Sequence, residues 1–174
     1  MTHDTATELI CAGVLPHTRT WADLGAGTGT FTLALLDLLP QGCVYALDKS
    51  PHMLWRLSRT ATVDLVVVEG DFTQPMDLPQ VDGILLANAL HYVPDPLPVL
   101  GHILTYLAPG GSLLFIEYDT DRPNLPWVPH PISQQRWEAL AAALKLPPVQ
   151  RLGQMSSQYG PHAMYASACH GIGG

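Results

Sequence analysis

The sequence has 174 residues and a net charge of −7, and charged residues make up 13% of it, about half the roughly 25% of typical soluble domains. A chain of this length predicts one domain, residues 1–174, with a hydrophobic core of its own. The eight Lys and Arg residues form no cluster, which argues against a nucleic-acid-binding surface, and no apolar run approaches the ~18 residues of a membrane span.

The low charge leaves two interpretations of the surface. In the first, part of the surface is covered by a partner chain, such as a second copy in a homodimer, or binds something apolar. In the second, the surface consists of uncharged polar residues. The three cysteines are widely spaced and form no C-x-x-C pair, so neither a disulfide framework nor a metal site is expected. The N-terminus lacks a signal-peptide pattern, and the expectation is a soluble, cytoplasmic protein.

Up to residue 118, apolar runs typical of strands alternate with runs typical of helices. Strands are expected at 20–25, 42–48, 63–71, 81–90 and 112–118. Helices are expected at 5–15, 29–39 and 50–60, and within 94–107. Ser50 is expected to cap the third helix, and the Ala-Pro-Gly-Gly run at 108–111 to end the fourth. This alternation predicts an α/β fold with a parallel sheet and right-handed crossovers.

The composition changes after residue 118. Residues 119–133 read as an irregular Pro-rich loop, and 133–146 as a helix. Two closing strands are expected at 148–156 and 162–170, paired around a turn at 157–161.

Three glycines separate the first strand from the following helix, in the pattern D-x-G-x-G-x-G that starts at Asp23. In open α/β sheets, ligands bind beyond the carboxyl ends of the strands, where glycines let the backbone approach them. A dinucleotide site prefers G-x-G-x-x-G, but Thr30 stands where the third glycine of that pattern belongs. Asp23 would also repel a pyrophosphate and favour an ammonium group.

Two more carboxylates end the next strands. Asp48 ends the second and could hold both hydroxyls of a ribose, which fits a nicotinamide cofactor as well. Asp71 ends the third, beside Phe72, and could accept from the amino group of a base. The ligand implied has a carboxylate, an ammonium, a ribose and an aminated base but no phosphate, and S-adenosylmethionine has these groups.

Five stretches in this order resemble the class I S-adenosylmethionine-dependent methyltransferases that act on small molecules. They are WADLGAGTGTFT, VYALDKSPHML, VVEGDF, VDGILLANALHYV and LAPGGSLLFIEY. The resemblance covers about residues 5–118 well and the tail loosely. It implies a Rossmann-like, doubly wound, seven-stranded sheet, mostly parallel with the last strand antiparallel. Many members carry a longer N-terminal segment or an insertion over the substrate, so 119–133 is the candidate lid loop here.

The resemblance also implies which residues bind the cofactor: Asp23, Gly25, Ala26, Gly27, Asp48, Lys49, Met53, Asp71, Phe72, Asn88 and Ala89. The glycine loop would line the methionine end, Asp23 and Asn88 would lie near the amino group, and Asp48 would hold the ribose. Lys49 and Met53 would flank the adenine, and Asp71 would meet its amine.

Methyl transfer requires the acceptor and the methyl donor to be held in line, and a general base helps when the acceptor is a hydroxyl or a thiol. His91 and Tyr92, after the fourth strand, are the candidate catalytic residues; the alternative for His91 is a packing or cofactor-contacting role. Glu117 to Asp119 could orient an acceptor or face solvent. Trp127 and His130 could form an aromatic wall or part of a surface loop.

Methyl transfer to a small-molecule acceptor, largely by positioning, is therefore the predicted function. One alternative is a binding or assembly protein with the methyltransferase fold and no catalysis, motivated by the low charge and the missing cap. A nicotinamide-dependent oxidoreductase is the other, and the glycine spacing and Asp71 argue against it. Nucleic-acid methylation is disfavoured because NALH stands where an Asn/Asp-Pro-Pro-Tyr signature would be.

Overall fold

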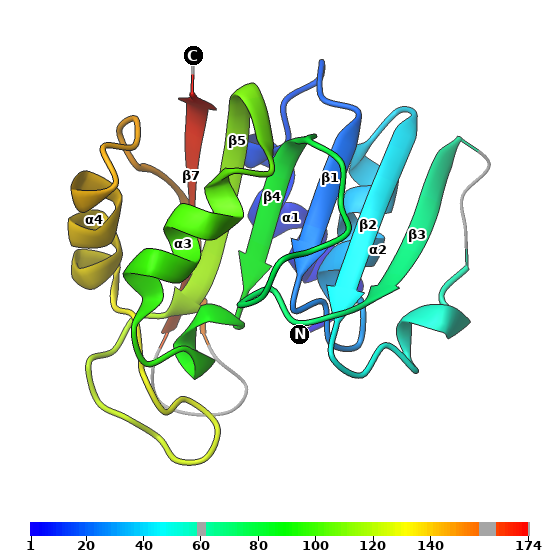
Figure 1. Cartoon of the computed structure of the whole chain (residues 1–174). Helices are drawn as coiled ribbons and strands as arrows, with labels where there is room; N and C mark the ends of the chain where they lie inside the picture. Colours follow the sequence, from blue (N-terminus) through cyan, green and yellow to red (C-terminus); the bar gives the residue numbers. More distant parts are fainter. Residues whose placement is uncertain (59–61, 157–162, 174) are drawn as a thin grey trace.

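The seven strands of the described residues form one sheet in the order β3-β2-β1-β4-β5-β7-β6 (Figure 1). The structure is a computed structural model, and it describes residues 1–58, 62–156 and 163–173. The strands are β1 (Thr20–Leu24), β2 (Gly42–Asp48), β3 (Val63–Glu69), β4 (Val81–Ala87), β5 (Leu107–Tyr118), β6 (Gln150–Ser156) and β7 (Ala163–Ile172). The pairings among β1 to β5 are parallel, whereas β7 runs antiparallel to both β5 and β6. The predicted fold class is confirmed.

Helices cover both faces of this sheet, as expected of a doubly wound fold. The α-helices are α1 (His3–Ile10), α2 (Thr30–Leu38), α3 (Pro96–Leu104) and α4 (Gln134–Ala143), and the short 3-10 helices are η1 (Cys11–Gly13), η2 (Leu54–Arg56) and η3 (Leu90–Tyr92). In Figure 1, α3 and α4 lie in front of the sheet and α1 and α2 behind it. No helix in the described part of the chain is long and apolar enough to cross a bilayer.

The sheet separates two hydrophobic cores. Successive side chains of a strand point to opposite faces, so Phe115 of β5 packs on the α3/α4 side and Leu114 on the α1/α2 side. Trp137 of α4 stacks on Phe115 with 4.1 Å between ring centroids, and Ile10 of α1 lies in the other core. Burial on both faces is why β4 and β5 read as continuous apolar runs in the sequence.

The predicted helix at 50–60 is wrong over its described residues. The segment forms turns and the single turn η2, and residues 59–61 lie outside the described residues. The Ser50 amide donates to Oδ1 of Asp48 (2.8 Å). Ser50 therefore closes a local turn on Asp48 and does not cap a helix. Pro51 and Leu54 are buried but Met53 and Trp55 are exposed, so the segment lacks the apolar stripe that would hold a longer helix against the core.

The Ala-Pro-Gly-Gly run does not end α3, contrary to the prediction. Helix α3 already stops at Leu104, and residues 108–111 lie inside β5. Leu107 pairs with Val81 before them, and the register between β4 and β5 shifts between Val81 and Gly83. The run thus forms an irregularity within the strand, where Gly110 takes a positive φ of 81°.

The two closing strands are confirmed as an antiparallel pair, while the predicted turn at 157–161 lies outside the described residues. The Pro-rich loop at 119–133 is irregular except for an isolated bridge between Asn124 and Val128.

A side chain fixes the register of β1 against β4 at the end of the sheet opposite the glycines. Oδ2 of Asp82 accepts from the amides of Arg19 (2.7 Å) and Thr20 (2.9 Å), and the Asp82 amide donates to Oγ1 of Thr20 (3.1 Å). These bonds lower the pKa of Asp82, although burial by itself would raise it.

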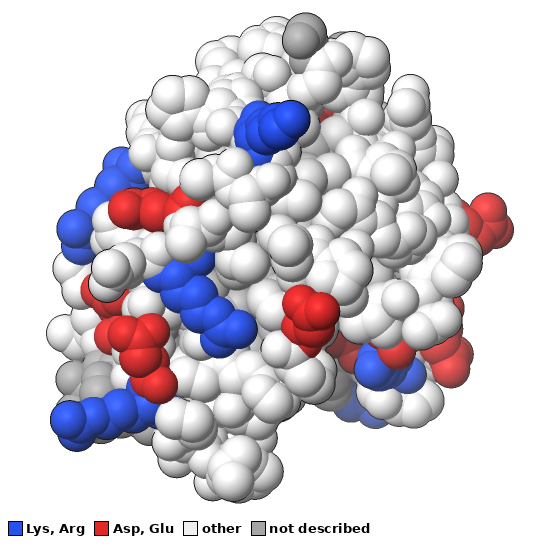
Figure 2. Space-filling model, turned by 60° about the vertical axis from the view of Figure 1, so that its left-hand side comes forward, with Lys and Arg blue, Asp and Glu red and all other residues white. Residues whose placement is uncertain are grey.

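Charged side chains are sparse and scattered on the face shown in Figure 2. Several large apolar side chains are exposed instead, foremost Leu125 and Trp127 at the tip of the Pro-rich loop.

Candidate functional site

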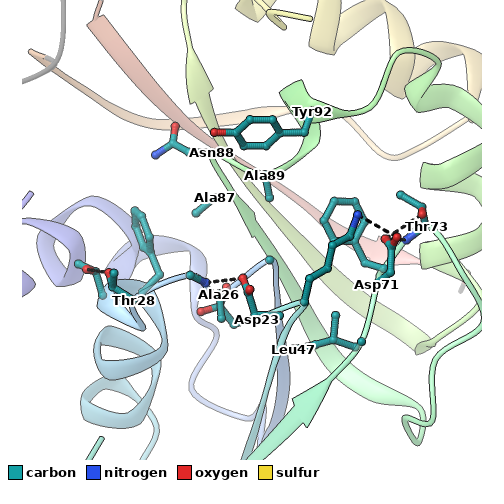
Figure 3. Close-up of a pocket in the computed structure, with 18 of the residues that line it drawn as sticks. Asp23, Ala26, Thr28, Leu47, Asp71, Thr73, Ala87, Asn88, Ala89 and Tyr92 are labelled. Carbon is teal, nitrogen blue, oxygen red and sulfur yellow. Dashed lines mark hydrogen bonds and ion pairs between the residues drawn. The ribbon is translucent and has the colours of Figure 1, made fainter. Parts of the chain in front are cut away.

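A cavity of about 700 Å³ opens at the carboxyl ends of β1 to β4 (Figure 3). This volume lies within the range of about 300–1,000 Å³ of small-molecule sites. Of the residues predicted to bind a cofactor, all but one line it: Asp23, Gly25, Ala26, Gly27, Asp48, Lys49, Asp71, Phe72, Asn88 and Ala89. The exception is Met53, which is 47% exposed outside the cavity wall because the segment after β2 is not the expected helix.

The glycine loop turns sharply under the cavity. The amides of Gly25 (2.8 Å) and Ala26 (3.0 Å) donate to the Leu47 carbonyl and so tie the loop to β2. Gly25 has a φ of 75°, and a Cβ there would lie 2.7 Å from the Cβ of Ala89, so this position requires glycine. A Cβ at Gly29 would instead meet Leu57 at 2.5 Å, away from the cavity. The third glycine therefore serves packing.

The carboxylate of Asp48 holds the glycine loop from the next strand. Its Oδ2 accepts from the Gly27 amide (2.8 Å), and its Oδ1 from the Ser50 amide (2.8 Å). Asp48 therefore fixes the shape of the loop and lines the cavity at the same time.

Asp23 is buried, and its Oδ2 accepts from the hydroxyl of Thr32 (2.6 Å). Burial raises the pKa of Asp23 to about 7, and the nearby charge of Asp48 adds to the increase, which the bond from Thr32 opposes. A cation placed in the cavity beside Asp23 would favour the ionised form.

Lys49 and Asp71 form an ion pair across the ends of β2 and β3, with 2.9 Å between Nζ and Oδ2 (Figure 3). The amide and hydroxyl of Thr73 donate to Oδ1 of Asp71 (2.9 and 2.8 Å). Burial by itself would raise the pKa of Asp71, but the bonds from Lys49 and Thr73 outweigh it and lower the pKa. Both oxygens of this carboxylate are thus engaged.

Asn88 follows β4 with a positive φ of 52°, a conformation that few residues other than glycine adopt. Its amide donates to the Ile116 carbonyl (2.9 Å), and its Nδ2 lies 3.5 Å from the sulfur of Met164. Its Oδ1 is buried and has no hydrogen-bond partner among the described residues. Since Asn88 lines the cavity, the wall offers an acceptor that a ligand donor could use.

His91 and Tyr92 lie in different environments, although they are neighbours in the sequence. Tyr92 is 55% exposed and lines the cavity, with its hydroxyl extended to the side of Asn88 (Figure 3). His91 is 2% exposed and is not part of the cavity wall. Its Nδ1 lies 2.7 Å from Oε2 of Glu117, and its amide donates to Oε1 of the same carboxylate (3.1 Å). Its Nε2 is buried without a partner in the described part of the chain.

The candidate lid loop is anchored at its base but lies outside the cavity wall. The amide of His130 donates to the His91 carbonyl (3.0 Å), and the Ser133 hydroxyl donates to Asp121 (2.7 Å). Trp127 is 68% exposed, and no described residue of 119–133 lines the cavity. Tyr118 and Asp119 also lie outside the wall.

Sequence reasoning missed part of the wall: Met1, Thr28, Thr30, Phe31, Leu47, Gly70, Thr73, Ala87 and Val93. Thr28 and Thr30 stand directly beside the glycines, and that position could have indicated them. Nothing in the sequence places Met1 beside residues so distant along the chain.

Two solved structures that share this architecture are those of methyltransferases. The chain superposes on human N-acetylserotonin methyltransferase, crystallised with S-adenosylmethionine, with a TM-score of 0.71 and 22% identity over 95% of this chain and 51% of that one. On the 1,6-didemethyltoxoflavin N1-methyltransferase of Burkholderia thailandensis, with bound S-adenosylhomocysteine, the TM-score is 0.72 and the identity 18%, over 97% and 77% of the two chains. At these identities the likeness shows the fold, a Rossmann-like methyltransferase fold.

The sequence itself gives the family. Residues 22–113, just over half of the chain, match the family model described as a methyltransferase domain. The chain therefore belongs to this methyltransferase family. This confirms the resemblance found in the sequence, and with it S-adenosylmethionine as the cofactor of the family.

The curated relatives are longer proteins. Trans-aconitate 2-methyltransferase of Azoarcus sp. (strain BH72) is 29% identical over 163 residues, which are 91% of this chain and 62% of that protein. An uncharacterised methyltransferase of Mycobacterium tuberculosis is 38% identical over 108 residues, 61% of this chain and 42% of the relative. The chain thus spans less than two-thirds of the length of either.

The cavity fits the cofactor of the family in its chemistry. The unpartnered oxygen of Asn88 and the buried carboxylate of Asp23 suit an ammonium group. Gly25 leaves no room for a side chain between the loop and Ala89, so the loop backbone packs closely against the residue that follows β4.

Proposed function

We propose that this chain binds S-adenosylmethionine in the cavity and transfers its methyl group to a small-molecule acceptor. The observation that carries the proposal is the set of groups that line the cavity. A glycine loop, three carboxylates at successive strand ends and an unpartnered amide oxygen surround one cavity. The names of the curated relatives and of the structural neighbours agree with a small-molecule acceptor.

The proposed roles follow from what each side chain presents to the cavity. Asp23 and Oδ1 of Asn88 would accept from the amino group of the cofactor, and the backbone of the glycine loop would lie along its methionine end. Asp48 would accept from the ribose hydroxyls with the lone pairs that the two amides leave free.

At the adenine end the structure adds a condition. Asp71 would accept from the adenine amine, with Phe72 beside it, but Lys49 already occupies one of the Asp71 oxygens. Because Lys49 is flexible and mostly exposed, it can rotate or share the oxygen when the site fills.

The bound cofactor supplies a methyl group on a positively charged sulfur, activated for in-line displacement. The chain's part is then to hold the acceptor in line and keep competing water away. Tyr92 lines the cavity and is half-exposed, which supports a role in contacting the acceptor, and its hydroxyl would orient a polar group there.

His91 does not reach the cavity, so in our proposal it is a positioning residue. Its ring packs against that of Tyr92, with 4.4 Å between centroids, and Glu117 fixes its orientation from β5. The pair would hold Tyr92 over the cavity. The lid role of 119–133, the homodimer and the cytoplasmic location remain predictions.

Calorimetric titration with S-adenosylhomocysteine, with NAD as the parallel control, tests the cofactor assignment. We expect micromolar binding of the first and none of the second. Asp48→Ala should weaken binding at least tenfold, since it removes the ribose acceptor and releases the glycine loop. The matched control is Asp77→Ala, an exposed carboxylate outside the cavity wall.

The outcomes separate the candidate functions. Binding of NAD instead would favour an oxidoreductase, and the methyltransferase proposal would fall. Binding of S-adenosylhomocysteine with no methyl transfer to any acceptor would favour a binding or assembly protein.

A further inference from the structure

We infer that the acceptor is an uncharged molecule with a flat or otherwise apolar body, and not a polycarboxylate. This inference rests on the proposed function and narrows its substrate class. It also differs from what the name of the relative in Azoarcus would suggest for this chain, since trans-aconitate carries three carboxylates.

The cavity is divided by charge. Its ionic side chains stand at the ends of β1, β2 and β3, where Asp23, Asp48, Lys49 and Asp71 surround the proposed cofactor subsite. Beyond them the side chains of the wall are uncharged, and in Figure 3 Thr28 and Tyr92 lie away from the ion pair of Asp71. Uncharged side chains of the wall include those of Met1, Thr28, Thr30, Phe31, Tyr92 and Val93.

Recognition of a polycarboxylate needs several unpaired cationic side chains, which the described wall lacks. Carboxylates in proteins are bound by Arg in bidentate pairs or by Lys as a point charge. Lys49 is the one Lys or Arg side chain on the described wall, and its Nζ is paired with Asp71 at the adenine end.

None of the other described Lys and Arg side chains lines the cavity. Two of them are held by backbone carbonyls: Arg19 donates to Pro16 and Thr18 beyond the opposite end of β1, and Arg136 on α4 donates to Pro131. A polyanion entering the cavity would lose hydration and meet like charge, without partners to offset either cost.

The uncharged part of the wall offers what a neutral ring needs. Tyr92 is half-exposed and presents its ring, and the mostly buried side chains of Phe31 and Val93 also line the cavity. The hydroxyls of Thr28, Thr30 and Tyr92 provide the few polar groups that orient a ligand in a mostly apolar site.

The test compares ligands that differ in charge but share a skeleton. Protein saturated with S-adenosylhomocysteine is titrated with trans-aconitate, with its neutral trimethyl ester and with 2-naphthol as a flat neutral probe. Binding is followed by saturation-transfer NMR and calorimetry at low ionic strength, where charge effects are largest. The series is repeated with sinefungin, whose amine supplies a positive charge near the place of the sulfonium.

We expect 2-naphthol to bind at least tenfold more tightly than trans-aconitate, and the ester to bind more tightly than the free acid. Tyr92→Ala should weaken 2-naphthol at least fivefold while changing the affinity for S-adenosylhomocysteine less than twofold. Trp55→Ala, an exposed aromatic side chain outside the cavity wall, is the matched control and should change neither.

Failure of this inference can be told apart from failure of the proposed function. If S-adenosylhomocysteine binds and trans-aconitate binds as tightly as the neutral probes, or accepts a methyl group, the acceptor class is wrong while the function stands. If S-adenosylhomocysteine binds but no neutral probe does, the acceptor class is likewise wrong while the function stands. If S-adenosylhomocysteine itself does not bind, the proposed function falls and this inference with it.

Discussion

His91 and Glu117 form a hydrogen-bonded pair inside the protein, with 2.7 Å between Nδ1 and Oε2 and both side chains almost fully buried. The pair joins η3, which follows β4, to the end of β5, and it lies directly behind the exposed ring of Tyr92. It therefore links the wall of the cavity to the interior of the sheet.

Removing one member of this pair should destabilise the fold. Glu117→Ala leaves the buried amide and ring nitrogen of His91 without their acceptor, and changes of this kind cost about 3–5 kcal/mol. Urea unfolding would measure the loss. Glu69→Ala, an exposed glutamate on β3, should change the free energy of unfolding by less than about 0.5 kcal/mol. A loss below about 1 kcal/mol for Glu117→Ala would contradict a structural role of the pair.

The buried carboxyl of Asp23 should make stability depend on pH. Its pKa is raised from 3.8 to about 7 in the folded chain, so the folded state holds the proton more tightly than the unfolded state. The resulting stabilisation is complete below pH 4 and is lost as the pH rises through 7. Three units correspond to about 4 kcal/mol, an upper value. Urea unfolding at pH 5 and pH 8 should show a smaller difference for Asp23→Asn than for the unchanged chain, and an unaltered difference would refute the assignment.

Gly25 and Gly110 allow the effect of backbone strain to be separated from that of crowding. Both have a positive φ, which costs a residue with a Cβ about 1–2 kcal/mol. At Gly110 nothing lies within 4 Å of an added Cβ, whereas at Gly25 it would strike Ala89. Gly25→Ala should therefore lower the melting temperature more than Gly110→Ala, and it alone should weaken binding of S-adenosylhomocysteine. Equal losses of stability, with binding intact in both variants, would show that the close approach to Ala89 does not matter.

The ion pair of Lys49 should matter more for the charge of Asp71 than for folding. Lys49→Met should raise the pKa of Asp71, since the bond from Lys49 is the largest effect that lowers it. An NMR titration of the Asp71 carboxyl would measure this. Because Lys49 is 67% exposed, the free energy of unfolding should change by less than about 1 kcal/mol. Lys145→Met, outside the cavity wall, should leave the Asp71 titration unchanged, and a similar response in both variants would exclude a specific pair.

The sequence was sufficient to predict the sheet and much of the cavity wall. Carboxyl ends of parallel strands meet at one edge of the sheet, so acids that end three strands, such as Asp23 and Asp48, had to lie together. The glycine spacing, read with these acids, separated this loop from a dinucleotide site.

Features that depend on tertiary packing were not predictable. The burial of His91 depends on its hydrogen bond to Glu117, 26 positions away along the chain, and no local sequence pattern indicates that pair. Met53 lies outside the cavity wall, on a segment where the turn at Asp48 and Ser50 stands in place of the predicted helix. The start of β5 was misplaced because a Pro-Gly-Gly run usually ends elements, whereas here pairing of Leu107 with Val81 carries the strand through it.

The carboxylate of Asp82 affects the alignment of the cavity, although it lies at the opposite end of the sheet. It fastens the first residues of β1 to β4, and the opposite ends of these two strands carry the glycine loop and Asn88. Two parallel strands held at one end cannot slide past each other, so the two halves of the cavity keep their alignment through a bond made at the far edge of the sheet. Loss of that bond would let the glycine loop shift relative to Asn88, although no residue of the cavity wall had been changed.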